Sequence, residues 1–159
     1  MVDKELNELT IKNTTASDLK KLVKNLQPND REELLYCEEP HLDPLLKLSR
    51  QMKRCILFKT VLLNDKVMGV FGVRVHEENK DFATLVALTT NEVKKYPKMY
   101  LKLAKQFIKE ARYYAKHLIF NTLKTARNCL KINKMLGFNT VAVVRTNNHT
   151  FYVDVNYGD

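Results

Sequence analysis

The chain has 159 residues, of which 45% are hydrophobic and 28% charged, and it carries a formal net charge of +9 at pH 7. A chain of this length and composition can bury a hydrophobic core without disulfide or metal staples, which excludes a disordered or fibrous protein. The longest apolar run, residues 67–73, is far shorter than the ~18 residues of a membrane-spanning helix, so no such helix is predicted.

Neither a secretory signal nor a metal site is predicted. The first residues carry acids and no apolar run follows them. Cys37, Cys55 and Cys129 are widely spaced and form no CxxC pair, which indicates reduced, core-filling thiols rather than disulfides or a zinc site. The four histidines show no HExxH spacing, and no Ser or Cys motif indicates a nucleophile.

The N-terminal third is predicted to hold one strand and three helices. Thr15 and Asp18 have the spacing of a capping box, which starts the first helix, and Pro28 ends it. Residues 38–40 contain a proline that separates the second helix from the third. In chain order these elements are an alternating edge strand at 9–13 and helices at 15–25, 30–37 and 41–52.

The middle of the chain changes to strands. Residues 55–63 and 67–75 flank a polar turn at 64–66 and are predicted to form an antiparallel hairpin. Residues 82–88 are an almost continuous apolar run, which is typical of a central strand covered on both faces.

A long amphipathic helix is predicted next. Thr89 and Glu92 have capping-box spacing, and Pro97 suits the first position of a helix that reaches about Lys116. Tyr113 and Tyr114 are expected to pack inward. The helix carries an apolar stripe at Leu101, Ala104, Ile108, Ala111, Ala115 and Leu118. It also carries a basic stripe at Lys98, Lys102, Lys105, Lys109, Arg112 and Lys116.

The remaining residues predict a strand from Leu118, a helix over 125–136 that Gly137 stops, and a closing hairpin of strands 139–145 and 150–155. No internal repeat or linker divides the chain. The predicted fold class is therefore a single α/β domain over residues 1–159, with a mixed sheet and helices on both faces.

This element order is that of the GNAT acyltransferases, and three passages strengthen the resemblance. Residues 10–19 resemble the opening strand and helix start of that family, and Asp30-Arg31-Glu32-Glu33-Leu34 resembles its D-x-x-E-[IL] second helix. Residues 131–138 resemble the terminal helix, which ends in LGF. The resemblance covers essentially the whole chain and implies a mostly antiparallel sheet.

Within that superfamily, residues 85–90 and the Tyr96-Pro97 pair are similar to a passage of the GNAT-like proteins of short-tailed bacteriophages, some of which are internal virion components. This resemblance implies a phage protein that resides in the host cytoplasm or the virion.

The resemblance implies acetyl-CoA as cofactor and direct attack by an amine. Strand 82–89 is then expected to part from its neighbour and leave a slot for the pantetheine arm, while a helix N-terminus holds the pyrophosphate. Glu33 is the implied general base. Lys94, Lys95 and Lys98 are expected near the phosphate groups of the cofactor. The implied cofactor-binding residues are Val86, Ala87, Leu88, Thr89, Thr90, Lys94, Lys95, Asn121 and Asn128.

Three positions depart from the family pattern. The glycine-rich pyrophosphate loop is replaced by Thr90-Asn91-Glu92-Val93-Lys94-Lys95. Asn133 stands where many members have a general-acid tyrosine, and an amide cannot donate a proton in that way. Ala126 aligns with the usual helix-starting asparagine.

Two interpretations therefore stay open. The first is an acetyl-CoA-dependent N-acyltransferase with an unknown amine acceptor. The second is a catalytically inactive protein of the same fold that binds nucleic acid, a virion component or a host protein through the basic stripe. Glu32 and Glu33 could also simply lie on an exposed helix face. The lysines of the basic stripe could likewise be surface residues without a binding role.

Overall fold

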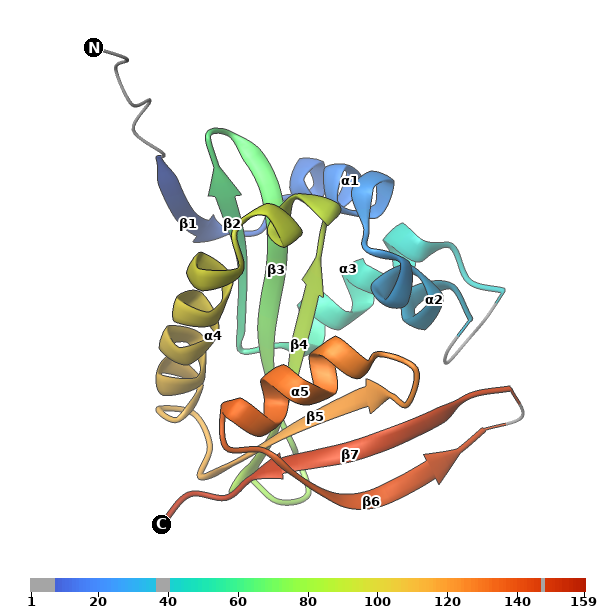
Figure 1. Ribbon diagram of the computed structural model, residues 1–159, viewed down its shortest axis with the longest axis vertical. Coiled ribbons are helices and arrows are strands. Elements are labelled where there is room, and N and C mark those ends of the chain that lie inside the picture. Colours follow the sequence, from blue (N-terminus) through green and yellow to red (C-terminus); the bar gives the residue numbers. More distant parts are fainter. Residues whose placement is uncertain (1–7, 37–40, 147) are drawn as a thin grey trace.

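The computed structural model describes residues 8–36, 41–146 and 148–159, which form a seven-stranded mixed sheet with helices on both faces (Figure 1). The sheet order is β1-β2-β3-β4-β5-β7-β6, and every neighbouring pair is antiparallel except β4 and β5. The strands are β1 (Leu9–Asn13), β2 (Leu57–Leu63), β3 (Lys66–Val75), β4 (Phe82–Thr89), β5 (His117–Leu123), β6 (Asn139–Arg145) and β7 (Thr150–Asn156). The predicted fold class is confirmed.

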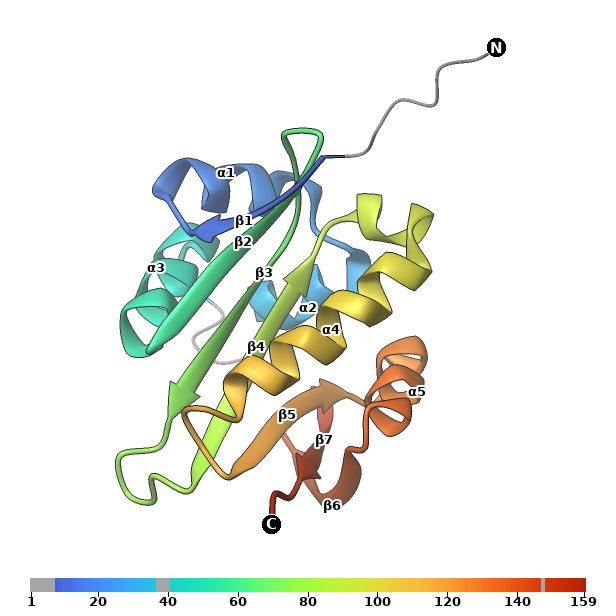
Figure 2. The same cartoon turned by 90° about the vertical axis from the view of Figure 1, so that its left-hand side faces the viewer.

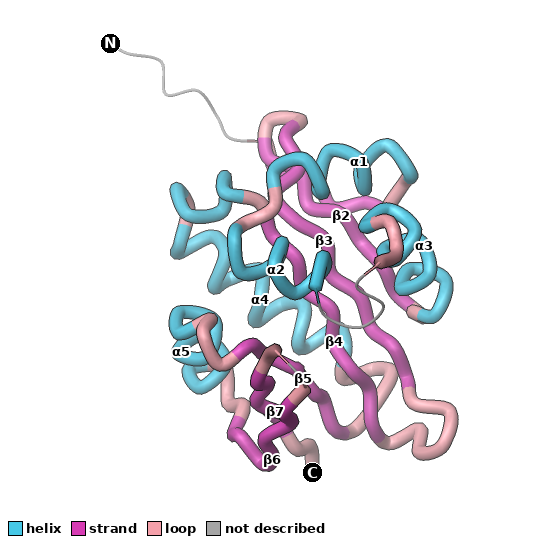
Figure 3. The backbone as a smooth tube through the Cα atoms, turned by 90° about the vertical axis from the view of Figure 1, so that its right-hand side faces the viewer, coloured by secondary structure: helices cyan, strands magenta, loops and turns pink. Residues whose placement is uncertain are grey.

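The helices divide between the two faces. Figure 3 shows the face covered by α1, α2 and α3, and Figure 2 shows the opposite face, along which α4 and α5 lie. On the α4 face, Phe107 packs against Phe71 with ring centroids 4.3 Å apart. The helices are α1 (Ala16–Asn25), α2 (Pro28–Tyr36), α3 (Pro44–Arg54), α4 (Pro97–Ala111) and α5 (Arg127–Met135), with a 3-10 helix η1 (Asn91–Lys95) before α4. No helix in the described ranges is long and apolar enough to span a membrane.

The capping box at the start of α1 is confirmed, because Thr15 Oγ1 accepts from the Asp18 backbone N–H while Asp18 Oδ2 accepts from Thr15 N–H. The two following helix starts were predicted wrongly. Pro28 is the first residue of α2 and not only the end of α1, since a missing N–H costs nothing at that position. Helix α3 begins at Pro44, where the Asp43 carboxylate accepts from two backbone N–H groups.

The hairpin of β2 and β3 is confirmed, and its turn consists of Asn64 and Asp65, both with positive φ (49° and 65°). Such conformations suit the tight turns that join twisted antiparallel strands, and Asn and Asp tolerate them better than most residues. Cys37 and the predicted break at 38–40 lie outside the described residues.

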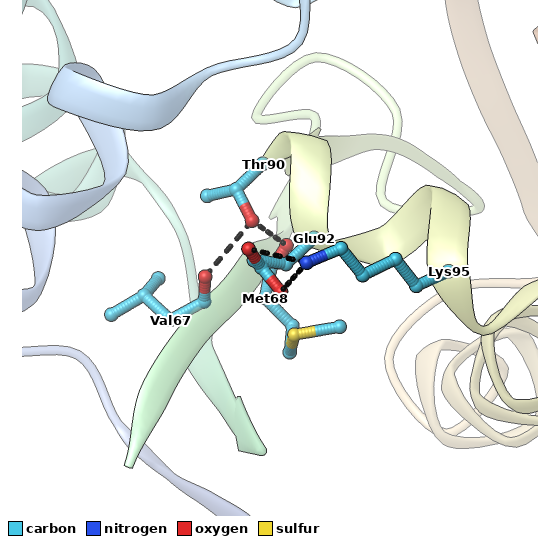
Figure 4. A network of polar contacts seen from close by, with 5 residues as sticks. All are labelled: Val67, Met68, Thr90, Glu92 and Lys95. Atoms are coloured by element: carbon cyan, nitrogen blue, oxygen red, sulfur yellow. Dashed lines mark hydrogen bonds and ion pairs between the residues drawn. The ribbon is translucent and has the colours of Figure 1, made fainter. Parts of the chain in front are cut away.

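The predicted capping box between Thr89 and Glu92 is wrong. Thr90 precedes η1, and its side chain is buried against β3, where Oγ1 donates to the backbone carbonyls of Val67 and Met68 (Figure 4). Glu92 pairs with Lys95 instead, with 3.2 Å between the Lys95 Nζ and a Glu92 carboxylate oxygen. These contacts fix the link from β4 to η1 on the sheet edge.

Helix α4 starts at Pro97 as predicted, but it ends at Ala111 and not at Lys116. Tyr113 is 82% exposed, so the expectation that it packs inward is wrong, and Tyr114 is also exposed. The early end follows from Arg112, whose guanidinium bonds the Lys116 carbonyl and the Asn156 side chain and so ties the following turn to the C-terminal segment. Gly137, with φ of 90°, ends helix α5 as predicted.

Candidate functional site

Strands β4 and β5 are joined by a very short ladder. Their parallel pairing runs only from Phe82 with His117 to Thr84 with Ile119. Beyond that point β4 continues along β3 as far as Thr89, while β5 continues along β7 as far as Leu123. The two strands consequently diverge, as Figures 1 and 2 both show, and the predicted parting is confirmed.

The edge of β4 that faces the gap is hydrogen-bonded to other residues at its C-terminal end, at Thr89. Thr89 N–H donates to Asp30 Oδ2 at 2.8 Å, and its C=O accepts from Gln27 N–H at 3.0 Å. Because alternate residues of a strand point their backbone groups the same way, Leu85 C=O and both backbone groups of Ala87 point toward the gap, while Leu85 N–H belongs to the last bond of the ladder with β5. The slot is thus an open stretch of strand edge between Thr84 and Thr89.

Two cavities lie on either side of this slot. The larger, about 520 Å³, lies against the face that carries α2 and α3, and the smaller, about 60 Å³, lies against α4 and α5. Four residues line both of them and mark where they approach each other: Ala87, Tyr100, Phe120 and Asn133. We call the region that these four residues border, between the two cavities at the divergence of β4 and β5, the passage.

Four titratable side chains from three helices line the larger cavity, and Tyr100 among them also borders the passage: Asp30 and Glu33 of α2, Tyr100 of α4 and Cys129 of α5. Burial raises the pKa of Asp30 to about 6, although the two hydrogen bonds that it accepts from Thr89 oppose the rise. Burial also raises the pKa of Cys129 to about 11, with contributions from the Asp30 and Glu33 carboxylates.

Tyr100 stays protonated at this passage. Burial raises the pKa of its hydroxyl above the ordinary value for tyrosine, and the neighbouring Cys129 and Asp30 raise it further. A protonated phenol close to two carboxyl groups of α2 can donate a hydrogen bond or a proton, and the carboxylates can accept one.

The structure brings most of the predicted residues to the slot. Glu33, Val86, Ala87, Leu88 and Asn121 line the larger cavity. Thr89 lines the smaller cavity, but its backbone N–H is already bonded to Asp30 of α2 and its C=O to Gln27, which precedes α2.

The other predicted residues lie elsewhere. Thr90 is buried against β3 and its hydroxyl does not reach the slot. Lys94 is exposed on η1, Lys95 is paired with Glu92, and Asn128 is exposed in the first turn of α5.

Asp30 and Tyr100 were missed as site residues. Asp30 begins the DREEL passage, so the motif itself carried the signal, but Glu33 was chosen from it. Tyr100 carried no signal beyond its position in the first turn of the long helix, because nothing in the pattern indicates that this turn overhangs the gap between β4 and β5.

Asn133 has a structural role. It is buried, and its amide donates to Thr122 Oγ1 at 3.0 Å and to Asp154 Oδ2 at 3.2 Å. Asp154 also accepts from Thr140 Oγ1 at 2.6 Å. This network fastens α5 to β5, β6 and β7.

The β6–β7 hairpin reaches across to α2. His149, which precedes β7, has its Nε2 3.3 Å from Glu32 Oε1, so the hairpin end contacts the helix that carries Asp30 and Glu33. Within the described part of the chain, no group of three or more His, Cys, Asp or Glu side chains is arranged to hold a metal ion.

The same fold occurs in solved acetyltransferases. The YncA protein of Salmonella typhimurium, solved with its cofactor acetyl-CoA, is 14% identical, with a TM-score of 0.69 over 96% of this chain and 95% of that one. An aminoglycoside acetyltransferase in complex with coenzyme A and kanamycin is 14% identical, with a TM-score of 0.66 over 94% and 95%. A GNAT-family acetyltransferase from Streptococcus pneumoniae is 11% identical, with a TM-score of 0.63 over 96% and 100%.

These likenesses define a GNAT fold. No protein-family model matches the sequence, and neither does any curated protein.

The pKa of Asp30 makes stability depend on pH. Since it lies near 6 in the folded chain against 3.8 for a free aspartate, the folded state binds more protons between these values, and the free energy of unfolding falls as pH rises through them. The loss is on the order of 3 kcal/mol. Asp30→Asn keeps an oxygen that accepts from Thr89 and should remove this slope in urea titrations from pH 4 to pH 7. Asp65→Asn, in the exposed hairpin turn, should retain it, and an unchanged slope in Asp30→Asn would contradict the assignment.

Proposed function

We propose that this protein is an acetyl-CoA-dependent N-acetyltransferase that transfers the acetyl group to a primary amine by direct attack. The observation that carries the proposal is the open edge of β4 between Thr84 and Thr89, which faces a diverging β5 and separates two cavities. The acetyltransferases of the same fold that were solved with acetyl-CoA or coenzyme A support it.

The residues at the slot fit a slender amide-containing chain. The C=O of Leu85 and the N–H and C=O of Ala87 can pair with its amides as a neighbouring strand would, and Val86 and Leu88 line the cavity beside them. Acetyl-CoA supplies an activated acetyl thioester when it is bound. Thr89 is already bonded to Asp30, so in this proposal it delimits the slot and does not bind the arm directly.

In this proposal, the phosphate groups of acetyl-CoA bind at the first turn of α4, because the chain has no glycine-rich loop there. The first turn of α4 has backbone N–H groups with no partner inside the helix, and Pro97 occupies its first position. Lys94 and Lys98 are exposed beside this turn and can add positive charge, and Asn128 at the start of α5 can donate a hydrogen bond. Lys95 contributes less, because Glu92 neutralises it.

Proton transfer is assigned to the cluster at the passage. An ammonium must lose a proton before its nitrogen attacks, and Asp30, whose pKa lies near 6, is largely ionised at neutral pH and can accept it. Glu33, the base implied by the sequence, lies one turn further along α2 and is proposed to hold the amine beside Asp30. Tyr100 is the proposed donor to the departing thiolate as the carbon–sulfur bond breaks and the carbon–nitrogen bond forms. The second proton of the attacking nitrogen returns to the Tyr100 oxygen, so that the products are the amide, the free thiol and one proton held by Asp30.

Binding of acetyl-CoA should raise the melting temperature. A ligand at 100 times its Kd adds about 2.7 kcal/mol, which corresponds to roughly 5–10 °C for a chain of this size. Ala87→Phe, which fills the slot, should abolish the shift, while Val143→Phe on the exposed strand β6 should not. No shift of the unaltered protein at millimolar acetyl-CoA would overturn the proposal.

The assigned roles separate in steady-state kinetics. Tyr100→Phe and Asp30→Asn should each lower kcat/KM by about 100-fold or more, because each removes one proton-transfer group, and both should keep the acetyl-CoA shift. Asp30→Asn should also lose the fall in rate below pH 6. Glu33→Gln should raise KM for the amine more than it lowers kcat, and Tyr113→Phe, at an exposed tyrosine, should be unchanged. Equal rates for Tyr100→Phe and the unaltered enzyme would remove Tyr100 from the mechanism.

A second candidate function rests on the outer face of α4. Lys98, Lys102, Lys105 and Lys109 are all exposed along one side of the helix, whereas Arg112 is engaged by the C-terminal segment. We propose, as the alternative, a catalytically inactive protein of phage origin that uses this stripe to bind nucleic acid, a virion component or a host protein. Clustered positive charge of this kind has sequence-independent affinity for phosphates.

Duplex DNA is the simplest probe of the stripe. If the stripe binds phosphates, replacing its four lysines by glutamine should weaken DNA binding and reduce the slope of log K against log salt by about 0.9 for each lost contact. A matched variant that neutralises Lys20, Lys21 and Lys24 on α1 should leave the slope nearly unchanged. Absence of DNA binding by the unaltered protein at low salt would exclude the nucleic-acid form of this alternative.

A further inference from the structure

The larger cavity is lined by two carboxylates, Asp30 and Glu33, and by four cations, Lys47, Arg50, Arg54 and Arg74. At one end are Asp30 and Glu33, next to the position where Asp30 bonds Thr89. At the other end are Arg74, which pairs with Thr84 in the sheet, and Arg54, the last residue of α3. Arg74 and Asp30 therefore adjoin opposite ends of the stretch of β4 from Thr84 to Thr89.

Arg74 faces the cavity rather than the opposite side of the sheet. Its cross-strand partner Thr84 lies on the same face as Val86 and Leu88, which pack toward α1, α2 and α3. Burial raises the pKa of the nearby Cys55 thiol to about 11, and the Arg74 guanidinium opposes this rise. Arg74 therefore lies beside the end of α3, from which Arg54 extends.

Two other cations also line this cavity, Lys47 and Arg50, and both have partners of their own. Lys47 is buried, and its Nζ donates to the carbonyls of Leu34 at 2.7 Å and Leu35 at 3.3 Å, which joins α3 to the end of α2. Arg54 and Arg74 make no hydrogen bond or ion pair with any other residue that the structure describes. Their guanidinium groups are available to a ligand.

Between the two ends, the cavity wall offers a hydrogen-bond acceptor. Gln51 lies on the same face of α3 as Arg54, and its Oε1 is buried with no donor within the described ranges. An acceptor without a donor is costly when buried, so a ligand that supplies an N–H or O–H in this region gains from meeting it.

We infer that the acceptor is an elongated primary amine that carries a carboxylate at its far end, an inference that rests on the acetyltransferase function proposed above. The ammonium lies beside Asp30 and Glu33 at the slot, and the carboxylate lies between Arg54 and Arg74, where guanidinium groups can bind it through paired hydrogen bonds. A second positive charge at that end would be repelled, so polycationic amines such as kanamycin are disfavoured.

Three amines of equal chain length test this inference: ε-aminocaproate, pentylamine and cadaverine, whose far ends are negative, neutral and positive. With acetyl-CoA and a thiol-release assay, kcat/KM should fall in that order, with ε-aminocaproate at least tenfold above cadaverine. Arg74→Gln and Arg54→Gln should each lower the value for ε-aminocaproate about tenfold and leave pentylamine unchanged. Arg74→Glu should favour cadaverine, and Lys20→Gln, on exposed α1, should alter nothing.

The outcome separates this inference from the function on which it rests. If acetyl-CoA stabilises the protein but cadaverine reacts as well as ε-aminocaproate, the acceptor assignment is wrong and the acetyltransferase proposal stands. If acetyl-CoA does not bind, calorimetric titration of ε-aminocaproate alone still decides. Binding that Arg74→Gln weakens tenfold would retain the anionic site, and no binding, or binding equal to that of cadaverine, would overturn it.

Discussion

The short ladder between β4 and β5 is the constraint on which the rest of the molecule depends. A parallel pair that ends at Thr84 and Ile119 leaves backbone groups of β4 exposed in the middle of a sheet, where they would ordinarily be bonded. The groups at the end of this edge, at Thr89, are bonded by the Asp30 carboxylate and the Gln27 amide. Both cavities, and the cluster of titratable groups between them, exist because the remaining edge is open.

Asp30 connects the architecture of this edge to its chemistry. Its carboxylate bonds the Thr89 N–H and hydroxyl, so it holds α2 against the end of β4, and the same burial that this contact requires brings its pKa close to neutral pH. In the proposed mechanism, one carboxyl group therefore serves both stability and proton transfer. Asn133 fastens α5 to the sheet through Thr122 and Asp154, and Tyr100, which lines both cavities, is the proton donor in the proposed mechanism.

Much of the fold could be predicted from the sequence, because hydrophobic periodicity and cap residues act locally. The capping box at Thr15 and the stop at Gly137 were found in this way. Thr89 was misassigned because its partner, Asp30, is distant in the chain, and no local pattern reveals a bond of that kind. For the same reason the slot was anticipated only through a resemblance, and the opposing charges of Arg74 and Glu33 emerged only once β3 and α2 faced one cavity.

The same short ladder divides the sheet into two parts that are well bonded internally and weakly bonded to each other. Strands β1 to β4 form one continuous hydrogen-bonded unit and β5 to β7 form another, and only three residue pairs join them. Local unfolding tends to separate a structure where few hydrogen bonds join its parts, because separation there breaks the fewest bonds. Amide hydrogens of the β5–β7 unit should therefore exchange with solvent as a group of their own, and a ligand that bridges the seam would slow that exchange in both units together.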